Sequence, residues 1–189
     1  MGSPAGIEQL LREAAGGDEH AWRTIVERFT GLVWATARAH RLATADAADV
    51  VQTTWLRLVE HLDRIREPER LGAWLATTAR HECLRTIRLQ GRELPSEDAE
   101  AFEGADAAGS PDANLLTRER DSALWNAFTK IADRCQRLLR LLAASDPPTY
   151  EEISAATGMP IGAIGPTRAR CLDQLRRALD VSVLEAGPS

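Results

Sequence analysis

Large apolar side chains recur at alternating steps of four and three residues along this chain, and this spacing is the feature that most limits its possible folds. The steadiest run consists of Val51, Trp55, Leu58, Leu62 and Ile65. Because an α-helix completes a turn every 3.6 residues, side chains spaced in this way lie on one face of a helix. No segment shows the alternation with a period of two that is typical of a β-strand. The sequence therefore predicts an all-α protein.

Two further helices are predicted in the first half of the chain, at about 18–41 and 69–90. Asp18 suits the N-cap of the first of them, because a carboxylate there accepts hydrogen bonds from free backbone N–H groups. Pro68 lies just beyond the middle helix, where a helix is expected to have ended. These helices predict one small helical unit over residues 1–92.

Charged residues are distributed unevenly along the sequence, and one acidic stretch separates two parts of the chain. Residues 93–114 hold seven acidic and no basic side chains, together with Ala, Gly, Ser and Pro and few large apolar residues. A stretch of this length and composition does not form a packed core. We therefore expect an acidic flexible linker at 93–114 between two helical domains, at 1–92 and 115–189.

The second domain has the pattern of a helix-turn-helix. A supporting helix is predicted from an apolar stripe that includes Leu124, Phe128 and Leu138, and the sequence Asp-Pro-Pro at 146–148 ends it. A short helix at about 149–157, a turn at Gly158 and a longer helix reaching Leu179 follow.

Motifs for catalysis and for cofactors are missing from the sequence. The four histidines form no metal-binding pair, and neither a nucleophile elbow nor a phosphate-binding glycine loop occurs. Cys83, Cys135 and Cys171 are odd in number, far apart and without a Cys-x-x-Cys pair, so neither a disulfide framework nor a zinc site is expected. We predict a non-enzymatic protein with no cofactor and no metal, located in a reducing cytoplasm. No apolar run is long enough to predict insertion in a membrane.

Two helices carry an excess of arginine. Residues 70–92 hold five arginines and one acidic residue, and residues 166–179 hold four arginines and one aspartate. Either surface alone is compatible with an ordinary solvated helix face. Their occurrence in both domains, one of them a helix-turn-helix, favours binding to DNA.

Three stretches resemble bacterial RNA polymerase sigma factors of the extracytoplasmic-function (ECF, group 4) type in the sigma-70 family. Residues 46–65 are similar to region 2.2, residues 70–88 to regions 2.3 and 2.4, and residues 149–179 to the region 4 helix-turn-helix. The likeness extends from about Asp18 to Leu179. It implies a factor that binds core RNA polymerase, recognises and melts the promoter minus-ten element, and reads the minus-thirty-five element.

The resemblance also implies positions for the contacts of the first domain. The positions expected to contact polymerase are Asp49, Gln52, Leu56 and Arg57. The positions expected to contact the minus-ten element are Thr77, Thr78, Arg80, His81, Arg85 and Arg88. His81 stands where the family often has Asn and is expected to hold an unstacked base, while the arginines hold phosphates. Trp74 fits either a base-stacking position or the core.

In the second domain, Thr167, Arg168 and Arg170 are the positions expected to contact the minus-thirty-five element. The sequence departs from the family here, because many members have Lys-Ser-Arg where this chain has Gly165, Pro166 and Thr167. Pro166 lacks an amide hydrogen, so it either kinks a helix that starts near Pro160 or starts the helix later.

The partners implied are core RNA polymerase and promoter DNA, with an anti-sigma factor as a further possible partner. Two other functions are compatible with the same residues. One is a helix-turn-helix transcriptional regulator that acts without polymerase. The other is a helical protein-interaction module without a role at DNA.

Overall fold

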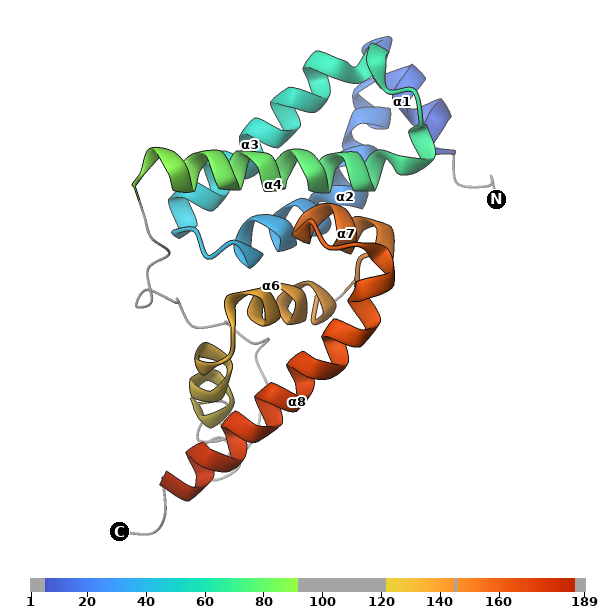
Figure 1. Ribbon diagram of the computed structural model, residues 1–189. Helices are drawn as coiled ribbons and strands as arrows, with labels where there is room; N and C mark the ends of the chain where they lie inside the picture. The colour runs from blue at the N-terminus through green and yellow to red at the C-terminus, as the bar shows by residue number, and fades with distance from the viewer. Residues whose placement is uncertain (1–5, 92–121, 145, 186–189) are drawn as a thin grey trace, which may run out of the picture.

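The computed structural model describes residues 6–91, 122–144 and 146–185, with the side chains of 180–185 left out (Figure 1). The described residues are helical and contain no strand, which confirms the all-α prediction. The first helical unit (residues 6–91) holds α1 (Ile7–Ala15), α2 (Glu19–Ala39), α3 (Thr44–His61) and α4 (Leu71–Leu89), with short 3₁₀ turns at Leu62–Arg64 and Pro68–Arg70. The second helical unit (residues 122–185) holds a helix over 122–130, then α6 (Asp133–Leu142), α7 (Tyr150–Thr157) and α8 (Ile161–Glu185).

The core of the first helical unit lies between α2, α3 and α4. Ile25, Leu58 and Leu75 are completely buried there, and each belongs to an apolar stripe of its helix. The Asp18 carboxylate accepts a hydrogen bond from the Ala21 amide at 2.8 Å, which confirms the predicted N-cap of α2. No helix in the described part of the chain is long and apolar enough to cross a membrane.

The second helical unit contains the predicted helix-turn-helix. Thr149 and Glu152 form a reciprocal capping box at the start of α7. Gly158 ends α7 with a φ of 72°, a left-handed conformation that glycine adopts without a steric penalty. α8 begins at Ile161 and continues through Pro166. Of the two alternatives for this proline, the structure therefore shows the one in which it lies inside the helix.

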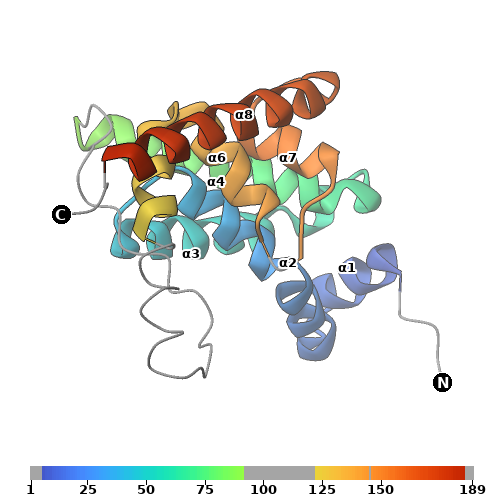
Figure 2. The same cartoon turned by 90° about the horizontal axis from the view of Figure 1, so that it is seen from below.

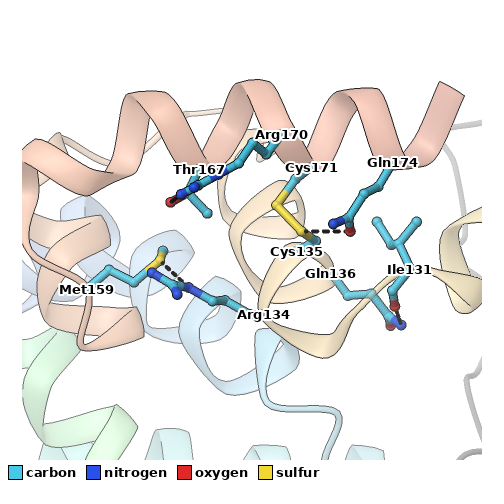
Figure 3. Close-up of a disulfide and its surroundings, with 9 residues drawn as sticks. All are labelled: Ile131, Arg134, Cys135, Gln136, Met159, Thr167, Arg170, Cys171 and Gln174. Atoms are coloured by element: carbon cyan, nitrogen blue, oxygen red, sulfur yellow. Dashed lines mark hydrogen bonds between the residues drawn. A yellow bond between two sulfur atoms is a disulfide. The ribbon is translucent and has the colours of Figure 1, made fainter. Parts of the chain in front are cut away.

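A disulfide joins α6 to α8, and the expectation that the cysteines form none was wrong (Figure 3). Cys135 and Cys171 are 36 residues apart in sequence, yet their Cα atoms lie 5.2 Å apart because the two helices pack side by side. Closing a loop of this length stabilises a folded unit by about 4 kcal/mol in the chain-entropy model. Cys83 is free and buried in the first helical unit.

The two helical units pack against each other, with α6 and α7 lying between α8 and the first unit (Figure 1 and Figure 2). α7 contacts α4, and α6 contacts α2. Small side chains fill much of this contact, where a separate buried cluster consists of Ala39, Ala76, Leu141 and Ala156. The predicted acidic linker at 93–114 lies outside the described residues.

Candidate protein and nucleic-acid interfaces

An apolar groove lies on the outer side of α3, next to α2. Its lining includes Trp22, Val51 and Trp55, and the rings of Trp22 and Trp55 meet edge to face with centroids 6.2 Å apart. Leu56 and Val59 also line it and are 55% and 53% exposed, although both are large and apolar. Exposed apolar side chains gathered in one groove are typical of a surface that binds another protein.

The residues predicted to contact a protein partner do not all lie in this groove. Gln52 and Leu56 line it, and Asp49 is exposed one turn earlier on α3. Arg57 instead lies toward α4, where its Nε is 3.9 Å from a carboxylate oxygen of Glu82. Sequence reasoning missed Val59, which could have been found as a second exposed apolar residue three positions after Leu56.

A second hollow lies between α3 and α4 and carries polar and aromatic groups. It is lined by Arg57, His61, Trp74, Thr78, His81 and Glu82. The rings of His61 and Trp74 lie with centroids 6.1 Å apart. His81 is exposed at this hollow, and the Thr78 hydroxyl donates to the Trp74 carbonyl at 2.9 Å. Flat rings and hydrogen-bonding groups in one hollow suit an unstacked nucleic-acid base.

Two of the predicted arginines extend the basic surface beside this hollow. Arg85 is exposed and donates to Glu82 at 3.4 Å, and Arg88 is exposed one turn further along α4. Glu82 was missed by sequence reasoning, and it holds Arg57 and Arg85 from one position. The carboxylate therefore lies within ion-pair distance of both guanidinium groups.

Arg80 lies on a different face of α4 from His81. Its guanidinium lies against Gly158 in the turn between α7 and α8, where an added Cβ would come within 2.7 Å of Nη2. Thr77 is half-buried. Arg80 therefore belongs to the contact between the two units in this arrangement, whereas Arg85 and Arg88 are exposed.

The predicted recognition residues of α8 divide into buried and exposed positions. Arg168 and Arg170 are exposed, but Thr167 is only 4% exposed. The Thr167 hydroxyl accepts a hydrogen bond from Arg170 Nη2 at 3.2 Å (Figure 3). In this arrangement the threonine holds the neighbouring arginine, and the two arginines are the side chains that can reach a ligand.

Polar contacts across the two units surround the small-residue cluster. Arg41 donates to Asp133 at 3.0 Å, and the arginine side chain is 12% exposed. His40 Nε2 donates to the Ala156 carbonyl at 3.3 Å. Burial lowers the pKa of His40 from 6.5 to about 4. The hydrogen bond to Ala156 opposes this shift in pKa, and the nearby charges of Arg137 and Arg80 add smaller lowerings.

Part of this chain matches a family model, and most of its length is similar to known proteins. A family model described as Sigma-70 region 2 matches residues 25–93, which cover most of α2 and all of α3 and α4. The ECF RNA polymerase sigma-E factor of Escherichia coli (strain K12) is 27% identical over 182 residues, covering 92% of each chain. The ECF RNA polymerase sigma-E factor of Haemophilus influenzae is 22% identical over 165 residues, covering 83% of this chain and 86% of the relative.

Among solved structures, the fold is similar to that of CnrH in complex with the cytosolic domain of CnrY. The TM-score is 0.60 and the identity 21%, and the match covers 94% of this chain and 99% of the other. This likeness extends over both helical units and shows a common fold.

Proposed function

This chain belongs to the sigma-70 family as an ECF sigma factor, and on that premise we propose that it binds core RNA polymerase, recognises and melts the minus-ten element and reads the minus-thirty-five element. Sigma factors are non-catalytic subunits, so the chain is not an enzyme. One observation carries the proposal: the helical unit that matches region 2 presents an apolar groove and, beside it, a hollow with arginines at its edge.

The apolar groove on α3 is the surface we assign to the polymerase. Covering Leu56 and Val59 with a partner protein removes the most apolar surface from water, because both residues are more than half exposed. This burial would stabilise the complex. Gln52 lies in the groove and Asp49 is exposed one turn before it. These polar groups at the edge of an apolar centre suit the organisation of protein interfaces.

The hollow between α3 and α4 is the surface we assign to the minus-ten element. Extruding a base from a duplex costs a few kcal/mol, which stacking and hydrogen bonds in a pocket must offset. His81 and Thr78 line the hollow, and we assign these contacts to them. Arg85 and Arg88 lie beside them, exposed, and are suited to backbone phosphates.

The exposed arginines of α8 are the residues we assign to the minus-thirty-five element. Arg168 and Arg170 lie in the N-terminal half of the second helix of a helix-turn-helix, which is the part that enters the major groove. Arginine pairs with guanine through two hydrogen bonds. We assign to Thr167 the role of holding the Arg170 side chain in place.

The contact between the two units has to open for the proposed function. Arg80, assigned by resemblance to the minus-ten element, lies against Gly158 of the helix-turn-helix. The two promoter elements are also separate stretches of DNA, which the units must reach together. We therefore propose that the arrangement in Figure 1 is the form before promoter binding and that polymerase separates the units.

The proposal also includes the compartment in which the chain acts and a protein that regulates it. The polymerase partner implies that the chain acts in the cytoplasm. CnrH, whose fold this chain shares, was solved with the cytosolic domain of CnrY. This supports an anti-sigma factor as a further partner of this chain.

Run-off transcription with purified core polymerase on a library of promoter sequences tests the proposed function. We expect the chain to direct initiation from a subset of promoters that share two elements. Arg168→Ala and Arg170→Ala should each lower transcription about tenfold, because a good bidentate base contact is worth about 1–3 kcal/mol. Arg12→Ala, an exposed arginine of α1, is the matched control and should have no effect. Tight duplex binding by the chain without polymerase would instead support a polymerase-independent regulator.

His81→Ala should weaken transcription about tenfold and reduce the preference for one base in the minus-ten element. The physical reason is the loss of a ring that stacks on the unpaired base, a contact worth about 1–3 kcal/mol. The measurement is the base composition of the active promoters in the same library. His20→Ala removes an exposed histidine from the first turn of α2 and should leave this composition unchanged. An unaltered preference with His81→Ala would contradict the pocket.

A further inference from the structure

The disulfide of the second helical unit lies directly beneath the arginines assigned to DNA. Cys135 of α6 is 6% exposed and Cys171 of α8 is completely buried. Thr167 precedes Cys171 by four residues, so both side chains lie on the face of α8 that packs on α6 (Figure 3). The bond therefore fixes the position of the helix segment that carries Arg168 and Arg170.

The surroundings of the two sulfur atoms suit a pair of thiols as well as a disulfide. The Oε1 atom of Gln174 lies 3.4 Å from Sγ of Cys135 (Figure 3). A reduced Cys135 would donate its S–H to this oxygen, so reduction would not leave that buried donor without an acceptor. The site therefore already holds an acceptor for the Cys135 thiol that reduction would create.

The third cysteine has a different environment. Cys83 of α4 is free and buried in the core of the first helical unit. Burial raises the pKa of its thiol to about 12. Cys83 forms no disulfide among the described residues, whereas Cys135 and Cys171 lie within bonding distance of each other. The chain therefore contains one pair of cysteines positioned to change state and one cysteine that serves as an internal reference.

We propose that Cys135 and Cys171 form a reversible thiol–disulfide site that controls reading of the minus-thirty-five element, with the disulfide form reading it more strongly. This inference rests on the proposed function. In a reducing compartment the resting state of such a pair is the dithiol. Oxidation then ties α8 to α6 and orders the segment that presents Arg168 and Arg170.

The reaction partner is a small-molecule disulfide, such as glutathione disulfide, and the exchange balances in two steps. The Cys135 thiolate attacks one sulfur of the small disulfide, and one molecule of the small thiol leaves. Cys171 loses its proton and attacks the Cys135 sulfur of the mixed disulfide, and a second small thiol leaves. The protein loses two electrons and two protons, and the small disulfide gains both. Reduction is the reverse exchange, in which the small thiolate attacks Cys135, the more exposed of the two cysteines.

The first measurement counts thiols and does not depend on transcription. The full chain is equilibrated in buffers with different ratios of reduced to oxidised glutathione, then denatured, alkylated and weighed by mass spectrometry. We expect a reversible change between three alkylated cysteines and one, with Cys83 alkylated throughout. A count that is the same in every buffer, whether three or one, would overturn the proposal.

The second measurement follows stability and transcription in the two redox states. The oxidised wild type should melt about 10 °C or more above the reduced wild type, since the cross-link closes a loop of 36 residues. Run-off transcription from promoters with a minus-thirty-five element should be about fivefold higher when oxidised. Binding to core polymerase should be equal, because the apolar groove lies in the other unit.

Cysteine variants distinguish a failure of the redox inference from a failure of the proposed function. The double variant Cys135→Ala with Cys171→Ala should match the reduced wild type in both buffers, and Cys83→Ser should keep the full response. Equal melting temperatures or equal dependence on the minus-thirty-five element in the two states would overturn the redox inference. Absence of polymerase binding in both states would instead refute the proposed function, and the thiol count and melting shift would still decide whether the site is reversible.

Discussion

Leu56→Glu should lower the affinity of this chain for core RNA polymerase by about 100-fold, or about 2.7 kcal/mol, while leaving the fold intact. Leu56 is 55% exposed in the apolar groove, so the free chain hydrates the carboxylate without penalty. In the complex the same carboxylate loses water and meets apolar groups, and the burial of the leucine is lost. The measurement is a fluorescence titration of labelled chain with purified core enzyme.

Leu89→Glu is the matched control for this experiment. Leu89 is 78% exposed at the end of α4 and is not part of the groove. The same change of residue there should leave both the affinity and the melting temperature unchanged. If Leu56→Glu binds as tightly as the wild type, or if both variants lose affinity equally, the groove on α3 is not the polymerase surface.

Lowering the pH from 7.5 to 5 should shift the two units from packed to separated, because the contact needs a neutral His40. The pKa of His40 is lowered from 6.5 to about 4 in the packed form, by burial first and then by Arg137 and Arg80. Separation exposes the ring and returns the pKa toward 6.5. The packed form is therefore fully stable above pH 6.5 and loses stability as the pH falls toward 4. At pH 5 the loss is about 2 kcal/mol, or about 30-fold in the equilibrium between the two forms.

Small-angle X-ray scattering measures this shift as an increase in the radius of gyration. His40→Gln is the control, since its amide N–H can donate to the Ala156 carbonyl in place of Nε2 but does not titrate in this range. Carboxylates at the contact, such as Asp133 and Glu151, remain in both proteins, so they contribute equally. An equal expansion of both proteins at pH 5 would exclude His40 as the group responsible.

The two experiments address different steps of the proposed function. The Leu56→Glu variant tests binding to polymerase, which uses a surface that is already exposed in the packed form. The pH experiment with His40 tests separation of the two units, which exposes the face of α4 that carries Arg80. A chain that fails in the first step should still respond to pH, and the titration of His40 should leave the groove unchanged.

Much of the candidate site was predictable because its elements depend on neighbours within one or two turns. The stripe of α3 places Gln52 and Leu56 on the side away from Leu58, and the structure shows them exposed. His81 and Thr78 are likewise found together at the hollow. Arg57 and Glu82 were harder to place, because their contact joins two helices and no spacing within either helix reveals it.

The sequence by itself determined α2, α4, α7 and α8, the N-cap at Asp18 and the turn at Gly158, because each follows from backbone geometry and hydrogen bonds between near neighbours. It did not predict α1, nor the break at 131–132 that divides the expected supporting helix into the helix over 122–130 and α6. Only the tertiary structure decided that Cys135 meets Cys171, that Thr167 faces inward and that Arg80 lies against the second unit. These outcomes depend on how whole helices pack and rotate against one another. Residues tens of positions apart are brought into contact by the burial of apolar faces, and that arrangement is not encoded in any local pattern.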